Sequence, residues 1–163
     1  MRVVSNTSPL SNLAIIGRLP LVWEQFGAVI IPEAVSTELA RRAYPHALDA
    51  LSEARGNSLL TTVSIRESAA ADLLSAQLDR GEAEAIALAT QVKADWLLID
   101  ERAGRLIARR TGLRITGVLG ILIRAKTRGR LALVKPELEA LRSEARFFVG
   151  NNLEREVLAA VGE

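Results

Sequence analysis

Short apolar runs between helical segments are the feature of this sequence that most constrains its fold. Residues 28–31 read Ala-Val-Ile-Ile, and residues 96–99 read Trp-Leu-Leu-Ile. Such runs, with no polar alternation, are typical of strands that are buried on both faces, as in a parallel sheet. Segments with helical spacing of apolar residues lie between them. The pattern therefore predicts an α/β fold of three layers, α/β/α, with a central, mainly parallel sheet.

Turn and capping signals place the other elements. Ser8 is expected to cap the first helix, with Pro9 at its first position and Gly17 at its end. A length of 163 residues fits one domain over residues 1–163. We expect strands at residues 2–5, 28–31, 58–63, 96–99 and 113–116. We expect helices at residues 8–17, 19–26, 33–42, 46–54, 64–78, 82–92, 102–111, 118–128, 137–145 and 153–161.

The composition excludes several kinds of site. Hydrophobic residues make up 49% of the chain and aromatic residues 4%, so the core must be aliphatic. There is no cysteine and one histidine, which rules out disulfides, cysteine zinc sites and a histidine-rich metal site. No secretory signal is visible, and the longest apolar run, residues 118–123, is too short to span a membrane. A soluble cytoplasmic protein is expected.

Positive charge is concentrated in one stretch. Residues 102–135 hold ten Arg and Lys residues and no Asp or Glu, although the whole chain has a net charge of +2. The rest of the chain therefore carries −8. A dense positive field attracts polyanions, and arginine suits bidentate contacts to phosphate. The stretch predicts contact with nucleic acid, first through Arg102, Arg105, Arg109 and Arg110.

Acidic and amide side chains stand where strands and helices begin or end. One follows the first expected strand, two follow the strand at 96–99, two open an Ala-rich helix and one lies within the helix at 33–42. The carboxyl ends of parallel strands meet at one edge of a sheet, where ligands bind. Gathered carboxylates repel each other unless a hard cation neutralises them, which predicts a Mg²⁺ or Mn²⁺ site and phosphate chemistry. The positions are Asn6, Glu38, Glu82, Glu84, Asp100 and Glu101.

Each of the five acidic residues also has a simpler interpretation. Glu82 and Glu84 suit the first turn of a helix, where the dipole stabilises carboxylates. Asp100 and Glu101 could cap the following helix, and Glu38 could face solvent. Glu82 and Glu84 are two residues apart on a helix, so they point about 200° apart. One of the two is expected to face the site, and the sequence does not decide which.

Several segments together resemble PIN-domain proteins, in particular a bacterial and archaeal subfamily of PIN-like nucleic-acid-binding proteins. The resemblance runs from about residue 2 to residue 160, and the order and spacing of the segments match together. It implies a PIN-like fold. The segments are residues 4–10, residues 30–35 with Glu38, residues 78–89, residues 97–102 and residues 116–122.

The resemblance implies a metal-dependent ribonuclease related to VapC-type toxins, which pair with an antitoxin protein and often form homodimers. PIN-domain acidic residues bind Mg²⁺ or Mn²⁺. Carried over, the catalytic positions fall on Asn6, Glu38, Glu82 and Asp100, and the metal positions include Glu84 and Glu101 as neighbours. Thr7 or Ser8 matches a hydroxyl position that orders the site.

Asn6 departs from the family pattern, which usually has Asp at the first position. An amide oxygen can still bind a hard cation, but it brings no negative charge and cannot act as a base. Metal affinity and activation of water should both be lower. A PIN-fold module that binds nucleic acid without cleaving it, or that contacts a protein partner, is therefore the alternative.

The leading prediction is cleavage of RNA phosphodiesters by water that a divalent cation activates. Few aromatics predict that base stacking contributes little to specificity. The segment 147–149, Phe-Phe-Val, is a candidate exposed patch, with packing against the last helix as the alternative. A dinucleotide-binding domain and a serine hydrolase on Ser8 or Ser11 with His46 are disfavoured, since neither G-x-G-x-x-G nor G-x-S-x-G occurs.

Overall fold

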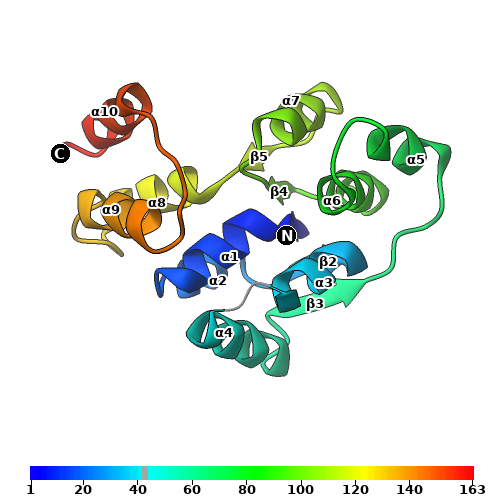
Figure 1. Cartoon of the computed structure of the whole chain (residues 1–163), viewed down its shortest axis with the longest axis horizontal. Coiled ribbons are helices and arrows are strands. Elements are labelled where there is room, and N and C mark those ends of the chain that lie inside the picture. The colour runs from blue at the N-terminus through cyan, green and yellow to red at the C-terminus, as the bar shows by residue number, and fades with distance from the viewer. Residues whose placement is uncertain (42–43) are drawn as a thin grey trace.

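Five parallel strands form one sheet in the computed structural model, which describes residues 1–41 and 44–163. The strand order is β3-β2-β1-β4-β5, and helices lie on both sides of it (Figure 1). The three-layer α/β/α prediction is confirmed. The strands are β1 (Val3–Ser5), β2 (Val29–Pro32), β3 (Leu60–Val63), β4 (Trp96–Leu98) and β5 (Ile115–Thr116). The helices are α1 (Thr7–Ile15), α2 (Pro20–Phe26), α3 (Glu33–Arg41), α4 (Pro45–Gly56), α5 (Ala69–Ser75), α6 (Arg80–Gln91), α7 (Arg102–Arg110), α8 (Val118–Thr127), α9 (Lys135–Ser143) and α10 (Asn151–Ala160).

Alternation along the strands divides the core into two layers. Val3 and Leu98 pack in one aliphatic cluster with residues of α1, α2 and α8. Val4 and Leu97 point the other way, into a cluster built mainly on α6. Successive strand side chains point to opposite faces, and both faces here are covered, so the strands are apolar throughout. None of the helices described is long and apolar enough to cross a membrane.

The strand order creates a topological switch point between β1 and β4. The chain runs outward from β1 to β2 and β3, and then returns to place β4 on the other side of β1. Val3, Val4 and Ser5 pair with Trp96, Leu97 and Leu98 in parallel register. The two strands therefore end side by side. In open α/β sheets, ligands bind at this place, beyond the carboxyl ends of the strands.

The predicted helix at 64–78 is wrong over its first five residues. The helix α5 begins at Ala69, where the Ser68 side chain caps it by accepting from the Ala71 N–H at 3.1 Å. Before it, the backbone of Arg66 bonds the Gln91 side chain through both its N–H and its carbonyl. These long-range bonds satisfy the backbone outside a helix.

The predicted start of the first helix also differs from the structure. The helix α1 begins at Thr7 with Asn6 at the cap position, and neither Asn6 nor Ser8 caps it through a side-chain hydrogen bond. The Ser8 hydroxyl instead donates to the Glu101 carboxylate. The last predicted residue of the helix at 33–42, Arg42, lies outside the described residues.

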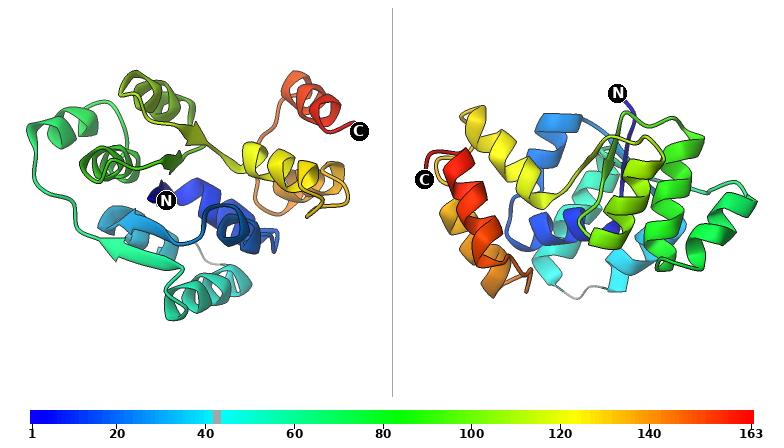
Figure 2. Two further views of the ribbon diagram at one scale, coloured as in Figure 1. Left: turned by 180° about the vertical axis from the view of Figure 1, so that it is seen from behind. Right: turned by 90° about the horizontal axis from the view of Figure 1, so that it is seen from above.

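The C-terminal helices lie to one side of the sheet. Figure 2 shows α8, α9 and α10 grouped beyond the β5 end. The Arg18 side chain, after α1, donates twice to the Glu137 carboxylate of α9, at 3.0 and 2.7 Å. Arg142 of α9 donates to Glu154 of α10 at 2.6 Å. These bonds join α9 to the end of α1 and to α10.

Candidate functional site

Asn6 and Glu101 join the ends of the two central strands. Asn6 follows β1, and its backbone N–H donates to the Leu98 carbonyl of β4 at 2.9 Å. The Asn6 side chain is buried, and its Nδ2 donates to Glu101 Oε2 at 3.0 Å. The other oxygen of Glu101 accepts from the Ser8 hydroxyl. Glu101 thus accepts a hydrogen bond from the amide nitrogen of Asn6, and the amide oxygen is left for another partner.

Asp100 follows β4 and faces the start of α8. Its Oδ1 accepts from the Val118 N–H at 2.9 Å, at a helix N-terminus that favours negative charge. Burial outweighs this bond and, with the nearby Glu101, raises the pKa of Asp100 from its usual 3.8 to about 7. Gly117 makes room for the carboxylate, since a Cβ at that position would collide with Asp100 Oδ1.

Glu82 takes part in a capping box at the start of α6. Asp79 Oδ1 accepts from the Glu82 N–H at 2.8 Å, and Glu82 Oε2 accepts from the Asp79 N–H at 3.3 Å. Glu82 is buried, and its Oε1 lies 3.0 Å from where a Cβ on Gly104 would stand. Burial, followed by the negative charges of Asp79 and Glu101, raises the pKa of Glu82 from 4.5 to about 7.

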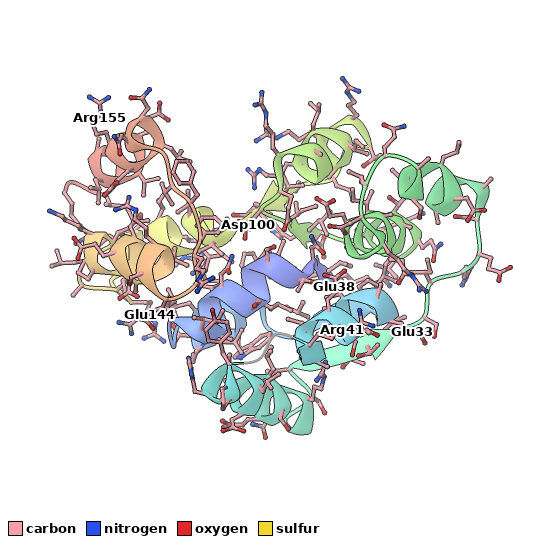
Figure 3. The ribbon with its side chains drawn as sticks, viewed as in Figure 1. Glu33, Glu38, Arg41, Asp100, Glu144 and Arg155 are labelled. Atoms are coloured by element: carbon pink, nitrogen blue, oxygen red, sulfur yellow. The ribbon has the colours of Figure 1, made fainter. Side chains whose placement is uncertain are left out.

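Glu38 approaches from α3 and is half-buried. Its Oε2 accepts from the Thr7 hydroxyl at 2.6 Å, so Thr7 connects α3 to the end of β1. The Glu38 carboxylate rests against Gly81, in the first turn of α6, where a Cβ would collide with its Oε1. Figure 3 labels Glu38 and Asp100, and both lie in the central part of the molecule beside α1.

Gly81→Ala is expected to displace the Glu38 carboxylate, because the new methyl group would occupy the space of Oε1. Alanine is compatible with a helix at this position, so the variant should fold as the natural chain does. Any activity that needs Glu38 should fall by about ten-fold or more. Gly56→Ala at the end of α4 is the matched control, since a Cβ there meets nothing within 4 Å. Circular dichroism and activity of both variants check this. Equal activity in the two would show that the position of Glu38 does not matter.

Glu84 points away from this cluster. Its Oε2 accepts from the Ala34 N–H at 3.1 Å, and its Oε1 accepts from Arg80 Nε at 2.9 Å. Ala34 is in the first turn of α3, where backbone N–H groups have no partner within the helix. Glu84 therefore accepts a hydrogen bond from one of these N–H groups. Of the two glutamates whose roles the sequence left open, Glu82 lies with Asp79 and Glu101, and Glu84 joins α6 to α3.

Glu84→Ala is expected to lower the free energy of unfolding by about 1–2 kcal/mol, because the Ala34 N–H loses its partner in a buried place. Glu82→Gln is not expected to lower the free energy of unfolding in EDTA at pH 8, because it removes a carboxylate whose charge burial disfavours. Urea unfolding of both variants under the same conditions measures the difference. A larger loss in Glu82→Gln would reverse these assignments.

Buried oxygen atoms without hydrogen-bond partners indicate where a cation could bind. Among the described residues, Gln25 Oε1 on α2 is a buried oxygen without a hydrogen-bond partner, and the same holds for three oxygens of the candidate site, Asn6 Oδ1, Glu82 Oε1 and Asp100 Oδ2. Such atoms are costly unless something binds them. All three belong to residues that the sequence predicts for the cation site, and oxygen atoms are the ligands that hard cations prefer.

The acidic side chains are not gathered as a complete coordination group. Within residues 1–41 and 44–163, no three of them stand close enough together to hold a metal ion between them. Mg²⁺ commonly binds one or two carboxylates and keeps several waters, so it does not require such a group. The oxygens without partners on Asn6, Glu82 and Asp100 are ligands that such a cation can use. Burial raises the pKa of Glu82 and Asp100, and a bound cation would offset the cost of their buried negative charge.

Three of the four predicted nucleic-acid-binding arginines lie along one side of α7. A hollow of about 440 Å³ is lined by Asp100, Arg102, Arg105, Leu106 and Arg109. Arg105 also donates to the Ile99 carbonyl at 2.9 Å, which anchors it beside the end of β4. Arg110 faces elsewhere, into a hollow between α5, α6 and α7. The basic side of α7 therefore leads directly to Asp100.

A larger cavity of about 640 Å³ adjoins the same carboxylate. Its polar side includes Ser8, Asp100, Glu101 and Arg105. Its apolar side comes from α8, α10 and the segment between α9 and α10, and includes Phe148. Asp100 and Arg105 line both cavities, so the two form neighbouring parts of one surface.

Sequence reasoning missed three parts of this arrangement. Asp79 with Glu82 has the spacing of a capping box, and that motif could have been found in Asp-Arg-Gly-Glu. The close approach of Gly81 and Gly117 to carboxylates depends on contacts between distant elements, and no local signal marks it. The family resemblance named Thr7 or Ser8 as a residue that orders the site, but the bond from Thr7 to Glu38 also joins distant elements and has no local signal.

The chain belongs to the PIN-domain family. A family model described as a PIN domain, DUF3368, matches residues 2–163. A search of curated proteins found no match, and a search of solved structures found none. Membership supports a nuclease-type fold, the use of a divalent metal as is general in PIN domains, and an association with nucleic acid.

Proposed function

We propose that the protein is a metal-dependent ribonuclease of PIN type. The observation that carries the proposal is the set of partnerless buried oxygens on Asn6, Glu82 and Asp100 at the switch point of the sheet. Glu38 and Glu101 supply further carboxylate oxygens around them. Membership of the PIN-domain family supports the same chemistry.

Mg²⁺ or Mn²⁺ would be held by Asn6, Glu82 and Asp100, with Glu38 and Glu101 as the adjacent carboxylates. When bound, such a cation supplies Lewis-acid activation of a phosphodiester and of the attacking water. Glu84 is left out of this set because its carboxylate bonds Ala34 and Arg80.

The residues of the chain itself position the site and the substrate. Thr7 holds Glu38, and Ser8 and Asn6 hold Glu101, so three consecutive residues after β1 orient two carboxylates. Arg102, Arg105 and Arg109 would bind backbone phosphates and direct the strand toward Asp100. Binding through these contacts should weaken steeply as salt rises.

Cleavage of a pool of fluorescent single-stranded RNAs in Mn²⁺ or Mg²⁺ tests the proposal. The natural chain and Glu84→Gln should give products, and EDTA should stop both. Glu38→Gln should lose activity by about 100-fold, as expected for a carboxylate that acts at the metal. Glu84→Gln is the matched control because it keeps an oxygen that accepts from Ala34. Equal metal-dependent cleavage by all three proteins would contradict the proposed site.

One observation favours a second candidate, a PIN-fold module that binds nucleic acid without cleaving it. Asn6 brings no charge to the position that usually holds Asp, and its amide suits the bond to Glu101. For this candidate, RNA binding by the natural chain would persist in EDTA while no metal produced cleavage. A toxin role, an antitoxin partner, a homodimer and a cytoplasmic location stay predictions from the family resemblance and the composition.

A further inference from the structure

Phe148 stands in an unusual position for a large apolar side chain. It is 86% exposed, although it lines the 640 Å³ cavity beside Asp100 and Glu101. Its neighbours in the chain are fixed, since Val149 is buried and the Phe147 N–H donates to the Leu141 carbonyl at 2.9 Å. The backbone therefore holds the ring at the edge of the cavity, and the exposed ring is not part of a loose tail.

The cavity combines a charged side with an apolar side. Asp100, Glu101 and Arg105 contribute the charged side. Leu153, which is 45% exposed, and Phe148 contribute to the other. A flat apolar body suits the apolar side, and Arg105 is the residue on the charged side that can bind an anionic group attached to that body. The volume is in the range of pockets that take small ligands.

The neighbouring basic hollow indicates what the anionic group is. Arg102 and Arg109 lie beside Asp100 and Arg105, which both hollows share. A nucleic acid strand with its phosphates along α7 would place a base next to the scissile position at the mouth of the larger cavity. Any unstacked base can stack on an aromatic side chain, because every base has a π-face.

We propose that Phe148 is a stacking platform for one base of a single-stranded nucleic acid, in the cavity beside Asp100. The inference rests on the proposed function for its substrate class. It also revises the expectation that base stacking contributes little, because that expectation counted the aromatic residues without their placement. A base inside a duplex has both faces covered, so the platform requires a single strand.

Fluorescence anisotropy of short labelled single-stranded RNAs in EDTA tests the inference without cleavage. The natural chain, Phe148→Ala, Phe148→Tyr and Leu133→Ala are compared, the last because Leu133 is exposed away from the cavity. Phe148→Ala should weaken binding about ten-fold, and Phe148→Tyr should bind as the natural chain does. RNAs with one abasic position, moved along the strand, should lose a similar factor with the natural chain and little with Phe148→Ala.

Several outcomes would overturn the inference. An affinity of Phe148→Ala for RNA equal to that of the natural chain would do so. A loss of affinity in Phe148→Ala that is the same for intact RNA and for every abasic RNA would do so too. A change from dimer to monomer in Phe148→Ala, seen by sedimentation, would assign the surface to a second copy of the chain. Failure of the natural chain to cleave RNA would remove the proposed nuclease activity but leave this binding result intact. If the natural chain cleaves RNA and Phe148→Ala binds RNA as tightly as the natural chain, the stacking role of Phe148 is contradicted and the nuclease proposal is kept.

Discussion

Asp100→Asn is expected to lower metal-dependent RNA cleavage by about 100-fold or more. The substitution keeps an oxygen that can accept from the Val118 N–H but removes the negative charge at the partnerless Oδ2. A cation held by few carboxylates loses much of its binding when one becomes an amide. Rates are measured over a range of Mn²⁺ concentrations. Recovery of the natural rate at high Mn²⁺ would mean that Asp100 binds the metal without acting further in the reaction.

The same variant should be more stable than the natural chain when metal is absent at high pH. The pKa of Asp100 is about 7 in the folded protein and 3.8 as the usual value. A raised pKa in the folded state means that the folded state binds more protons between these pH values, so stability falls as pH rises from about 4 through 7. Asp100→Asn removes this part of the fall.

Urea unfolding in EDTA at pH 5 and pH 8 measures the effect. The free energy of unfolding of Asp100→Asn should exceed that of the natural chain by about 1 kcal/mol or more at pH 8, and by less at pH 5. Glu82→Gln should behave in the same way, because the pKa of Glu82 is also raised to about 7. Mn²⁺ should reverse the order by stabilising the natural chain. Identical pH dependence in natural and variant proteins would contradict the assigned burial of these charges.

Asn6→Asp is the second change with a large expected effect. It replaces the amide nitrogen that donates to Glu101 Oε2 at 3.0 Å by a carboxylate oxygen, so two negative groups would face each other. Without metal, the lost hydrogen bond and the repulsion should cost about 1–3 kcal/mol of stability. With Mn²⁺, the added charge should strengthen cation binding and raise cleavage by about ten-fold or more.

Unfolding and cleavage with and without Mn²⁺ separate these effects. Asn57→Asp, at an exposed position after α4, makes the same change in net charge away from the site and is the control. A variant that is as stable as the natural chain in EDTA would contradict the bond between Asn6 and Glu101. Activity that appears in Asn6→Asp and is missing from the natural chain would favour the module that binds without cleaving.

The positions of Asn6 and Asp100 could be predicted because they depend on the strands. The expected strands at residues 2–5 and 96–99 correspond to β1 (Val3–Ser5) and β4 (Trp96–Leu98), and Asn6 and Asp100 follow the ends of these two strands. Residues after such ends lie together in any parallel sheet with this strand order. The sequence therefore located the edge at which the candidate site stands.

The directions of the other side chains could not be predicted in the same way. Glu82 and Glu84 are in one helical turn, and their different surroundings depend on where α3 and α7 pack against α6. The start of α5 at Ala69 depends on bonds between Arg66 and Gln91, which are far apart in the sequence. Phe148 was visible as a patch candidate, but its place beside Asp100 required the path of the chain from α9 to α10.

A crystal structure of the natural chain with Mn²⁺, with anomalous diffraction recorded at the manganese edge, tests the central claim most directly. We predict a manganese ion among Asn6 Oδ1, Glu82 and Asp100, and no ion at Glu84. Crystals of Asp100→Asn grown in the same Mn²⁺ concentration should show a much weaker peak. An ion bound elsewhere, or no ion at these oxygens at a concentration that supports cleavage, would contradict the account.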